Sequence, residues 1–194
     1  MAPLALAIYG ALSLLTLGVA FVVGRSPIET DGWFGPPGWS GHAISLVVGA
    51  MLALATVHAT RAFVKRWRWA KALHADLRPA VRDAGDVTLA VLGAASGIAE
   101  ELFFRGLLVP ALGLLFSSFV FGVIHQLRGK AGWIWASWAA VMGLLFGALF
   151  LATGSLLGAI VAHAAINVAN LRFLRDTDVE PQKPRRLGGL LGRV

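Results

Sequence analysis

Long apolar runs separated by short polar segments dominate this sequence. Six runs stand out, each bounded by glycine, proline or charged residues: 3–24, 41–60, 87–112, 114–127, 132–152 and 155–174. An α-helix needs about 20 apolar residues to cross a bilayer, so the fourth run spans only if its ends extend into the adjoining loops. The pattern predicts an all-α membrane protein with about six transmembrane helices.

A basic segment at 61–86 lies between the second and third runs. It carries seven Lys or Arg residues, with Trp67 and Trp69 among them. Nucleic-acid binding would also use basic and aromatic residues together, but a segment between two membrane spans more often lies on anionic lipid. We therefore predict a basic amphipathic helix on the cytoplasmic membrane surface, with anionic lipid as its partner and no nucleic acid.

Composition supports the membrane assignment and gives it an orientation. Of 194 residues, 57% are hydrophobic and only 14% charged, whereas a soluble domain carries about a quarter. When the six runs alternate direction, fifteen of the 17 Lys and Arg residues fall on one side. By the positive-inside rule, both termini and the basic segment are cytoplasmic. The Ala-, Gly- and Arg-rich composition is typical of a bacterial source, so we expect an integral protein of the bacterial inner (plasma) membrane.

Apart from Arg172 near the end of the sixth run, three charged residues lie inside the apolar runs, and all belong to one short stretch: Glu100, Glu101 and Arg105. Ionisable groups within a span cost several kcal/mol unless they are paired or hydrated, so they are functional candidates. Glu101 and Arg105 are separated by four residues and can form an ion pair on one helix face. Glu100 lies about 100° round the helix and is free to point elsewhere.

Two histidines and an asparagine lie in the later runs. His125 is near the end of the fourth run, while His163 and Asn167 share one face of the sixth. The other three histidines have no polar companion at helical spacing, and we interpret them as bystanders: His42, His58 and His74. The spans have no cysteine and no aspartate, which excludes a thiol nucleophile and an aspartyl protease.

Helix geometry predicts that these polar residues meet. Glu100 and His125 reach equal depth in antiparallel spans if the chain turns at 112–113, where Leu112 and Gly113 stand. Each then lies about 18 Å from the turn, and Asn167 lies about 18 Å from the start of the sixth run. Glycines four residues apart in the third and fifth runs allow the helices to approach closely: Gly93 and Gly97, Gly143 and Gly147.

A carboxylate, two imidazoles and a carboxamide are suited to the activation of water. Glu100 can act as general base, assisted by His125. His163 and Asn167 can donate hydrogen bonds to an oxyanion that forms on a carbonyl. A general base and an oxyanion site together are what hydrolysis of a peptide bond requires, so we expect peptide hydrolysis in or beside the bilayer.

Three motifs in order resemble those of one known family. Glu-Glu-x-x-x-Arg at 100–105, Phe-x-x-x-His at 121–125 and His-x-x-x-Asn at 163–167 are similar to the motifs of the CPBP family. This family contains CaaX-protease and bacteriocin-processing relatives, including Rce1-type prenyl-protein endopeptidases, and is also called Abi.

The resemblance implies an intramembrane protease. Members of this family are often labelled metalloproteases, and we favour a glutamic-type mechanism without a cofactor. Glu100 is then the base, His125 its partner and His163 with Asn167 the oxyanion site, while Glu101 and Arg105 support them. The resemblance also divides the chain into three parts. Residues 1–86 contain two helices and the basic segment, residues 87–174 form the catalytic core, and residues 175–194 are a polar basic tail. The substrate is a membrane-associated protein or peptide: a CaaX chain, a peptide precursor or a C-terminal sorting tail.

Other interpretations remain open. A zinc ion held by Glu100, His125 and His163 would give a metal-dependent version of the same protease. A serine mechanism could use Ser96, although the glycine expected two residues before it is missing. A non-catalytic membrane protein, such as an immunity factor, scaffold or small transporter, could use the same polar core to bind a ligand.

Overall fold

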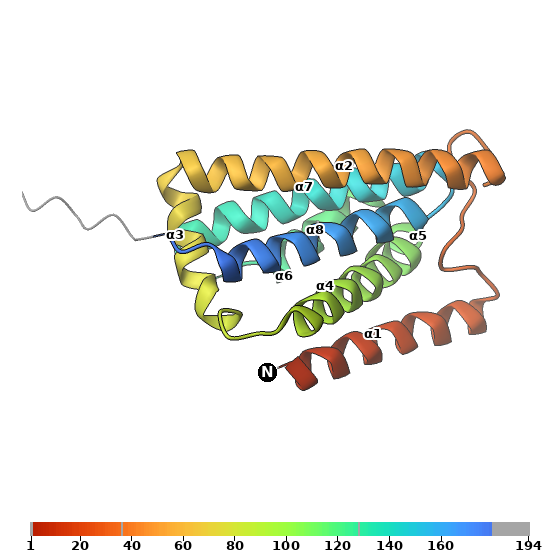
Figure 1. Ribbon diagram of the computed structural model, residues 1–194. Coiled ribbons are helices and arrows are strands. Elements are labelled where there is room, and N and C mark those ends of the chain that lie inside the picture. The colour runs from red at the N-terminus through yellow and green to blue at the C-terminus, as the bar shows by residue number, and fades with distance from the viewer. Residues whose placement is uncertain (1, 36, 128, 180–194) are drawn as a thin grey trace, which may run out of the picture.

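All six apolar runs form helices in the computed structural model, which describes residues 2–35, 37–127 and 129–179 (Figure 1). The protein is therefore an all-α membrane protein, as predicted. Five helices are long and apolar enough to cross a membrane. In chain order, they are α1 (Ala2–Val23), α2 (Trp39–Arg66), the helical stretch that begins with α4 (Asp86–Glu101), α7 (Lys130–Thr153) and α8 (Leu157–Asp176).

The third run changes its helical geometry before it ends. After α4 the chain continues as a seven-residue π-helix, η2 (Leu102–Leu108), and then as the short α5 (Val109–Leu112). Gly113 follows with φ +84°, a conformation that residues with a Cβ rarely adopt. The turn expected at 112–113 is present, because α6 (Leu114–Ile124) starts at the next residue.

The fourth run does not form a full span. Helix α6 has 11 residues, which gives a length of about 16 Å against a hydrocarbon thickness of about 30 Å. The helix ends at Ile124 because His125 leaves helical geometry, with φ −87° and ψ 0°. Its ends do not extend into the adjoining loops, so the predicted count of six transmembrane helices is not confirmed.

The basic segment forms two helices rather than one. Helix α2 continues to Arg66, Trp67 is extended, and α3 (Arg68–Leu77) then runs in a new direction (Figure 1). A short 3₁₀ turn, η1 (Arg78–Ala80), completes the segment. Helix α3 is amphipathic as predicted: Leu73 and His74 are buried, whereas Arg68 is exposed.

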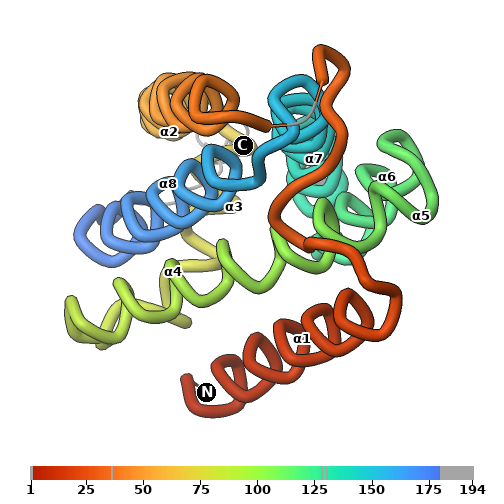
Figure 2. Tube along the Cα trace, turned by 90° about the vertical axis from the view of Figure 1, so that its right-hand side faces the viewer, coloured from red at the N-terminus to blue at the C-terminus, as the bar shows by residue number. Residues whose placement is uncertain are grey.

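The helices of the core pack side by side (Figure 2), and several of their closest contacts are at glycine. Helix α4 packs on α8, where a Cβ on Gly97 would lie 2.6 Å from the Ala164 nitrogen. Gly143 of α7 meets Ser118 of α6 in the same way. The predicted role of these glycines is confirmed, because larger residues would push apart the helices that carry the candidate residues. Helix α1 lies at the edge of the bundle, against α4 and η2.

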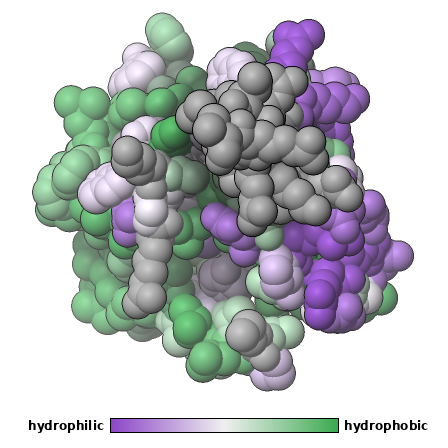
Figure 3. Space-filling view, turned by 90° about the vertical axis from the view of Figure 1, so that its left-hand side faces the viewer, coloured by the Kyte–Doolittle hydropathy of each residue, from purple (hydrophilic) through white to green (hydrophobic). Residues whose placement is uncertain are grey.

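The two ends of the bundle differ in character. Helix α3, the start of α4 and the end of α8 lie at one end (Figure 1). An ion pair of 2.8 Å between Asp86 and Arg175 joins α4 to α8 there. We call this the α3 end. Viewed from this end, hydrophilic residues gather over one side of the molecule (Figure 3).

The 24–38 connection lies at the opposite end and is fastened to the turn between α7 and α8. His42 Nδ1 is 2.8 Å from Ser155 Oγ, and His42 Nε2 is 3.4 Å from Glu29 Oε1. His42 thus has polar partners that helical spacing within its own span does not reveal. These contacts fix the loop end of the bundle, away from the α3 end.

Candidate active site

The π-helix carries a buried ion pair. Arg105 Nη1 donates to Glu101 Oε1 at 2.8 Å, and the two residues are 1% and 0% exposed. The Arg105 guanidinium lies 4.4 Å from the centre of the Phe121 ring, a cation–π contact. Ser117 of α6 donates to the Phe104 carbonyl of η2 at 2.9 Å, so the wide turn is supported by a neighbouring helix. The i, i+4 ion pair predicted from the sequence is present.

Glu100 points away from this pair and toward both candidate histidines. Its Oε2 lies 3.7 Å from His125 Nε2 and 3.8 Å from His163 Nε2. The Glu100 side chain is 12% exposed, and within the described part of the chain Oε2 is buried without a hydrogen-bond partner. A carboxylate oxygen between two ring nitrogens, slightly beyond hydrogen-bonding distance, leaves room for a bridging group.

Each imidazole is fixed through its other nitrogen. His125 Nδ1 lies 2.7 Å from the Phe121 carbonyl, and His163 Nδ1 lies 2.7 Å from Glu101 Oε1. Because a carbonyl and a carboxylate accept hydrogen bonds, both Nδ1 atoms donate, and a neutral ring then presents a lone pair at Nε2. Three acceptors therefore converge, and a water with two O–H groups or a shared proton can join them.

Asn167 belongs to the same region but contacts a different residue. Its Nδ2 donates to Ser96 Oγ at 2.9 Å, and Ser96 in turn donates to the Gly93 carbonyl at 3.1 Å. The second amide hydrogen and the carbonyl of Asn167 are left for other partners. Asn170 lies one turn further along α8, and no described residue hydrogen-bonds to its buried Oδ1.

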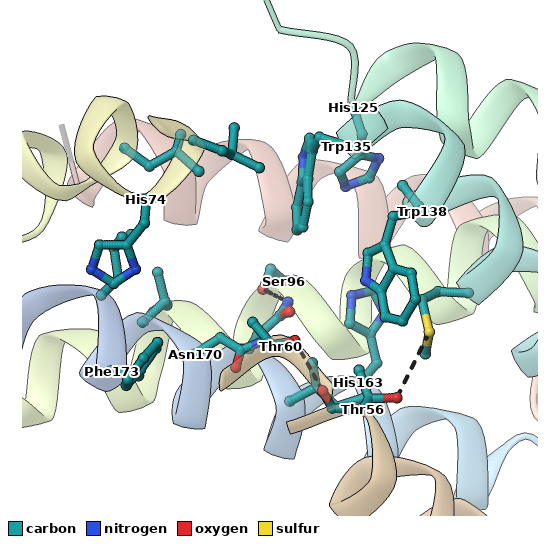
Figure 4. A pocket seen from close by; sticks show the side chains of 18 of the residues that line it. Thr56, Thr60, His74, Ser96, His125, Trp135, Trp138, His163, Asn170 and Phe173 are labelled. Atoms are coloured by element: carbon teal, nitrogen blue, oxygen red, sulfur yellow. Dashed lines mark hydrogen bonds between the residues drawn. The ribbon is translucent and has the colours of Figure 1, made fainter. Parts of the chain in front are cut away.

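A cavity of about 430 Å³ connects these residues. Glu100, His125, His163 and Asn167 all line it, together with a largely apolar and aromatic wall. The cavity runs to the α3 end, with His74 and Phe173 at one extremity, Ser96 and Asn170 in the middle, and His125, Trp135, Trp138 and His163 at the other (Figure 4).

The zinc set considered from the sequence does not have metal-site geometry. Within residues 2–35, 37–127 and 129–179, no three His, Asp or Glu side chains are arranged to hold one metal ion. Glu100 Oε2 is 3.7 Å from His125 Nε2 and 3.8 Å from His163 Nε2. Three ligands of one tetrahedral zinc lie about 3.3 Å apart, so the three side chains do not fit a zinc ion as they stand.

Sequence spacing found the residues at one end of the cavity and missed those along its walls. His74 looked isolated, yet it is buried in the cavity wall, with Nε2 2.8 Å from the Thr177 carbonyl. Tyr9 of α1 lines the cavity as well. A lone tyrosine in an apolar run was the available signal, although tyrosine in a membrane span carries little information alone. Ser96, considered as a nucleophile, instead binds Asn167 and Gly93.

Comparison with protein families gives a match to the second half of the membrane domain. Residues 86–169 match the family described as type II CAAX prenyl endopeptidase Rce1-like. The match includes all six candidate residues found inside the apolar runs. Searches of curated proteins and of solved structures found no match.

Proposed function

We propose that this chain is a member of the Rce1-like family, which residues 86–169 match, and that it has CAAX-type intramembrane protease activity. The protein is an intramembrane endopeptidase that cleaves a peptide bond of a membrane-associated protein or peptide. Glu100 activates water, and no metal takes part. The observation that carries this proposal is the position of Glu100 Oε2, buried between two imidazole Nε2 atoms at the end of a cavity.

The first step uses the convergence of acceptors at Glu100. A water in the space between Glu100, His125 and His163 donates a hydrogen bond to Oε2. As the water oxygen forms a bond to the scissile carbonyl carbon, Glu100 takes its proton and the carbonyl oxygen becomes an oxyanion. Glu100 then gives the proton to the leaving nitrogen, the C–N bond breaks, and a carboxylic acid and an amine result.

The oxyanion is stabilised by Asn167 and His163. Asn167 lines the cavity and uses one amide hydrogen on Ser96, so its second amide hydrogen can donate to the oxyanion. His163 donates from Nε2 only when the ring carries a second proton. Its Nδ1–H bond to Glu101 fixes the ring in the orientation that presents Nε2 to the reaction, as carboxylates do for catalytic histidines elsewhere.

The shape of the cavity supports entry of the substrate from the α3 end. Basic residues dominate α3 and its flanks, so the positive-inside rule places this end, and both termini, at the cytoplasm. An apolar, aromatic wall favours a lipid-like or hydrophobic segment over a soluble polar peptide. The bacterial inner membrane is the proposed location, and anionic lipid contacts the basic segment 61–86.

Reconstitution tests the mechanism. The purified full-length protein is placed in liposomes with internally quenched peptides of three kinds: farnesylated CaaX peptides, leader peptides and single-span peptides with C-terminal tails. Wild type is expected to cleave at least one kind. Glu100→Gln is expected to lose roughly 10³-fold or more, the loss expected when a general base is removed from a concerted site.

A matched substitution controls for the change of charge. Glu29→Gln makes the same replacement in the 24–38 loop, where the carboxylate is 46% exposed, and leaves cleavage unchanged. Cleavage by Glu100→Gln at the wild-type rate would overturn the proposed base. Loss of wild-type cleavage under 1,10-phenanthroline, restored by zinc, would overturn the metal-free mechanism and keep the protease.

A further inference from the structure

Asn170 is a polar side chain in the cavity that the proposed hydrolysis does not use. It lies on α8 three residues after Asn167 and lines the cavity between His163 and Phe173 (Figure 4). Its Oδ1 is buried, and no described residue hydrogen-bonds to it. A buried acceptor without a partner destabilises the folded protein, so contacts within the described part of the chain do not explain this carboxamide.

Helix α8 presents its polar side chains to the cavity in a row. His163, Asn167 and Asn170 are separated by four and three residues, so they follow one another along one side of the helix. The other α8 residues that line the cavity are apolar: Ile166, Leu171, Phe173 and Leu174. Asn170 is therefore the next polar group of α8 on the way from the proposed oxyanion site to the α3 end.

The spacing along α8 matches the backbone of an extended substrate. Asn167 and Asn170 are separated by about 4.5 Å along the helix axis. An extended peptide advances about 3.3 Å per residue. When the scissile carbonyl lies at Asn167, the backbone one or two residues nearer the α3 end therefore lies opposite Asn170.

The partner of Asn170 Oδ1 must be a hydrogen-bond donor, because a carboxamide oxygen only accepts. The cavity wall is largely apolar and aromatic, which favours an apolar substrate segment. Aliphatic side chains carry no N–H or O–H group, whereas every residue except proline carries a backbone N–H. This N–H loses its water when the segment enters the cavity, and it then needs an acceptor there.

We propose that Asn170 Oδ1 accepts a hydrogen bond from a backbone N–H of the substrate, one or two residues from the scissile bond on the side toward α3. The contact sets the register of the substrate, and so determines which peptide bond stands at Glu100. It recognises the backbone and does not depend on the side chains of the substrate. The inference rests on the proposed hydrolysis, because it requires a peptide in the cavity.

The first measurement needs no substrate: the full-length protein in mixed micelles is unfolded by titration with SDS. Asn170→Leu replaces an unpartnered carboxamide by an apolar group of similar volume, so it is expected to unfold at the same or a higher SDS fraction than wild type. Asn167→Leu is the matched control, because this carboxamide donates to Ser96 Oγ at 2.9 Å, and it is expected to unfold at a lower SDS fraction. Unfolding of Asn170→Leu at a lower SDS fraction than wild type would overturn the proposal, since the carboxamide would then hold the fold.

The second measurement removes the donor from the substrate. In the peptide that wild type cleaves best, the two backbone amides on each side of the scissile bond are replaced in turn by an ester, which has an oxygen in place of the N–H. One of these esters is expected to raise the KM of wild type about tenfold with little change in kcat, as the loss of one ground-state hydrogen bond does.

Asn170→Leu completes a cycle with this ester. It is expected to raise the KM of the unmodified peptide about tenfold, and to cleave the ester peptide and the unmodified peptide alike, because both changes remove the same hydrogen bond. Asn167→Leu is expected to lower kcat and still to distinguish the two peptides. If Asn170→Leu distinguishes them as wild type does, Asn170 does not bind the substrate backbone.

Glu100→Gln in the same assay separates the two proposals. If Glu100→Gln cleaves as wild type does, or if wild type cleaves none of the peptides, the proposed function fails. If Glu100→Gln is inactive and Asn170→Leu matches wild type in KM for every peptide, the proposed function stands and the role of Asn170 fails. The SDS titration tests Asn170 in either case.

Discussion

Arg105 is a buried cation whose compensation comes from one carboxylate, so its removal should destabilise the protein strongly. Glu101 Oε1 accepts from Arg105 Nη1 at 2.8 Å and from His163 Nδ1 at 2.7 Å. Arg105→Met keeps the length of the side chain and much of the packing against the Phe121 ring, but it leaves Glu101 with a single hydrogen-bond donor. Breaking a buried pair from one side costs about 3–5 kcal/mol, because the remaining charge stays buried.

The double substitution tests whether the cost of each single variant comes from an unpaired buried charge. Glu101→Gln alone leaves the Arg105 cation without a counter-charge and should cost a similar amount. Arg105→Met with Glu101→Gln removes both charges, and the introduced glutamine can still accept the His163 N–H through its side-chain oxygen. We expect the double variant to recover to within about 1–2 kcal/mol of wild type, since an uncharged pair of similar volume is tolerated in a core.

The assay is reversible unfolding in mixed micelles, in which SDS is titrated and the fluorescence of the seven tryptophans is followed. An exposed pair supplies the control: Arg82 and Asp83 are 3.2 Å apart, with side chains 59% and 85% exposed. Removing either charge there should change the free energy of unfolding by less than about 0.5 kcal/mol. The buried ion pair would be refuted if Arg105→Met and Glu101→Gln each lowered the free energy of unfolding by less than about 1 kcal/mol. It would also be refuted if the double variant lost as much as the two single variants together.

Three further predictions concern the frame of the site. Gly97→Ala should destabilise the protein by about 1–3 kcal/mol in the same SDS titration, because its Cβ would meet α8 backbone at 2.6 Å, whereas Gly10→Ala, with nothing within 4 Å, should not. Gly113→Ala should cost about 1–2 kcal/mol in that titration, since φ is +84° there, and a neutral result would contradict the assigned turn. Lys65→Gln with Arg68→Gln should reduce the number of anionic lipids retained in native mass spectrometry, at about 1 kcal/mol per charge; unchanged retention would count against lipid binding by this segment.

The candidate site was predictable because its residues are ionic or polar within apolar helices. Glu100, Glu101 and Arg105 are charged residues in an otherwise apolar span. Helical spacing correctly separated the Glu101–Arg105 ion pair from the Glu100 carboxylate, which faces the histidines. The turn at Gly113 followed from requiring Glu100 and His125 to reach equal depth. Long helices of known rise make such distances computable from the chain alone.

The parts that were missed depend on contacts between distant segments. Nothing local reveals that run 87–112 widens into a π-helix, which is supported by Ser117 of α6. Helix α6 ends at Ile124, where His125 leaves helical geometry, three residues before the expected end of the fourth run at 127. His74 and Tyr9 join the cavity only through packing of α3 and α1 on the core, which no spacing rule contains.

The cavity assigns different tasks to different parts of the chain. All the groups proposed to act on the peptide bond lie within the family-matched residues 86–169, on helices held at fixed distances by glycine contacts and the Arg105 pair. The cavity wall toward the α3 end is built largely from residues outside that segment, on α2, α3 and the end of α8. In the proposed mechanism, chemistry and selection of the substrate are therefore carried by separate surfaces. Changes in α3 are then expected to alter which chain enters without displacing Glu100, while changes near Gly97 are expected to affect both, because α4 and α8 hold the proposed base and oxyanion donors in one unit.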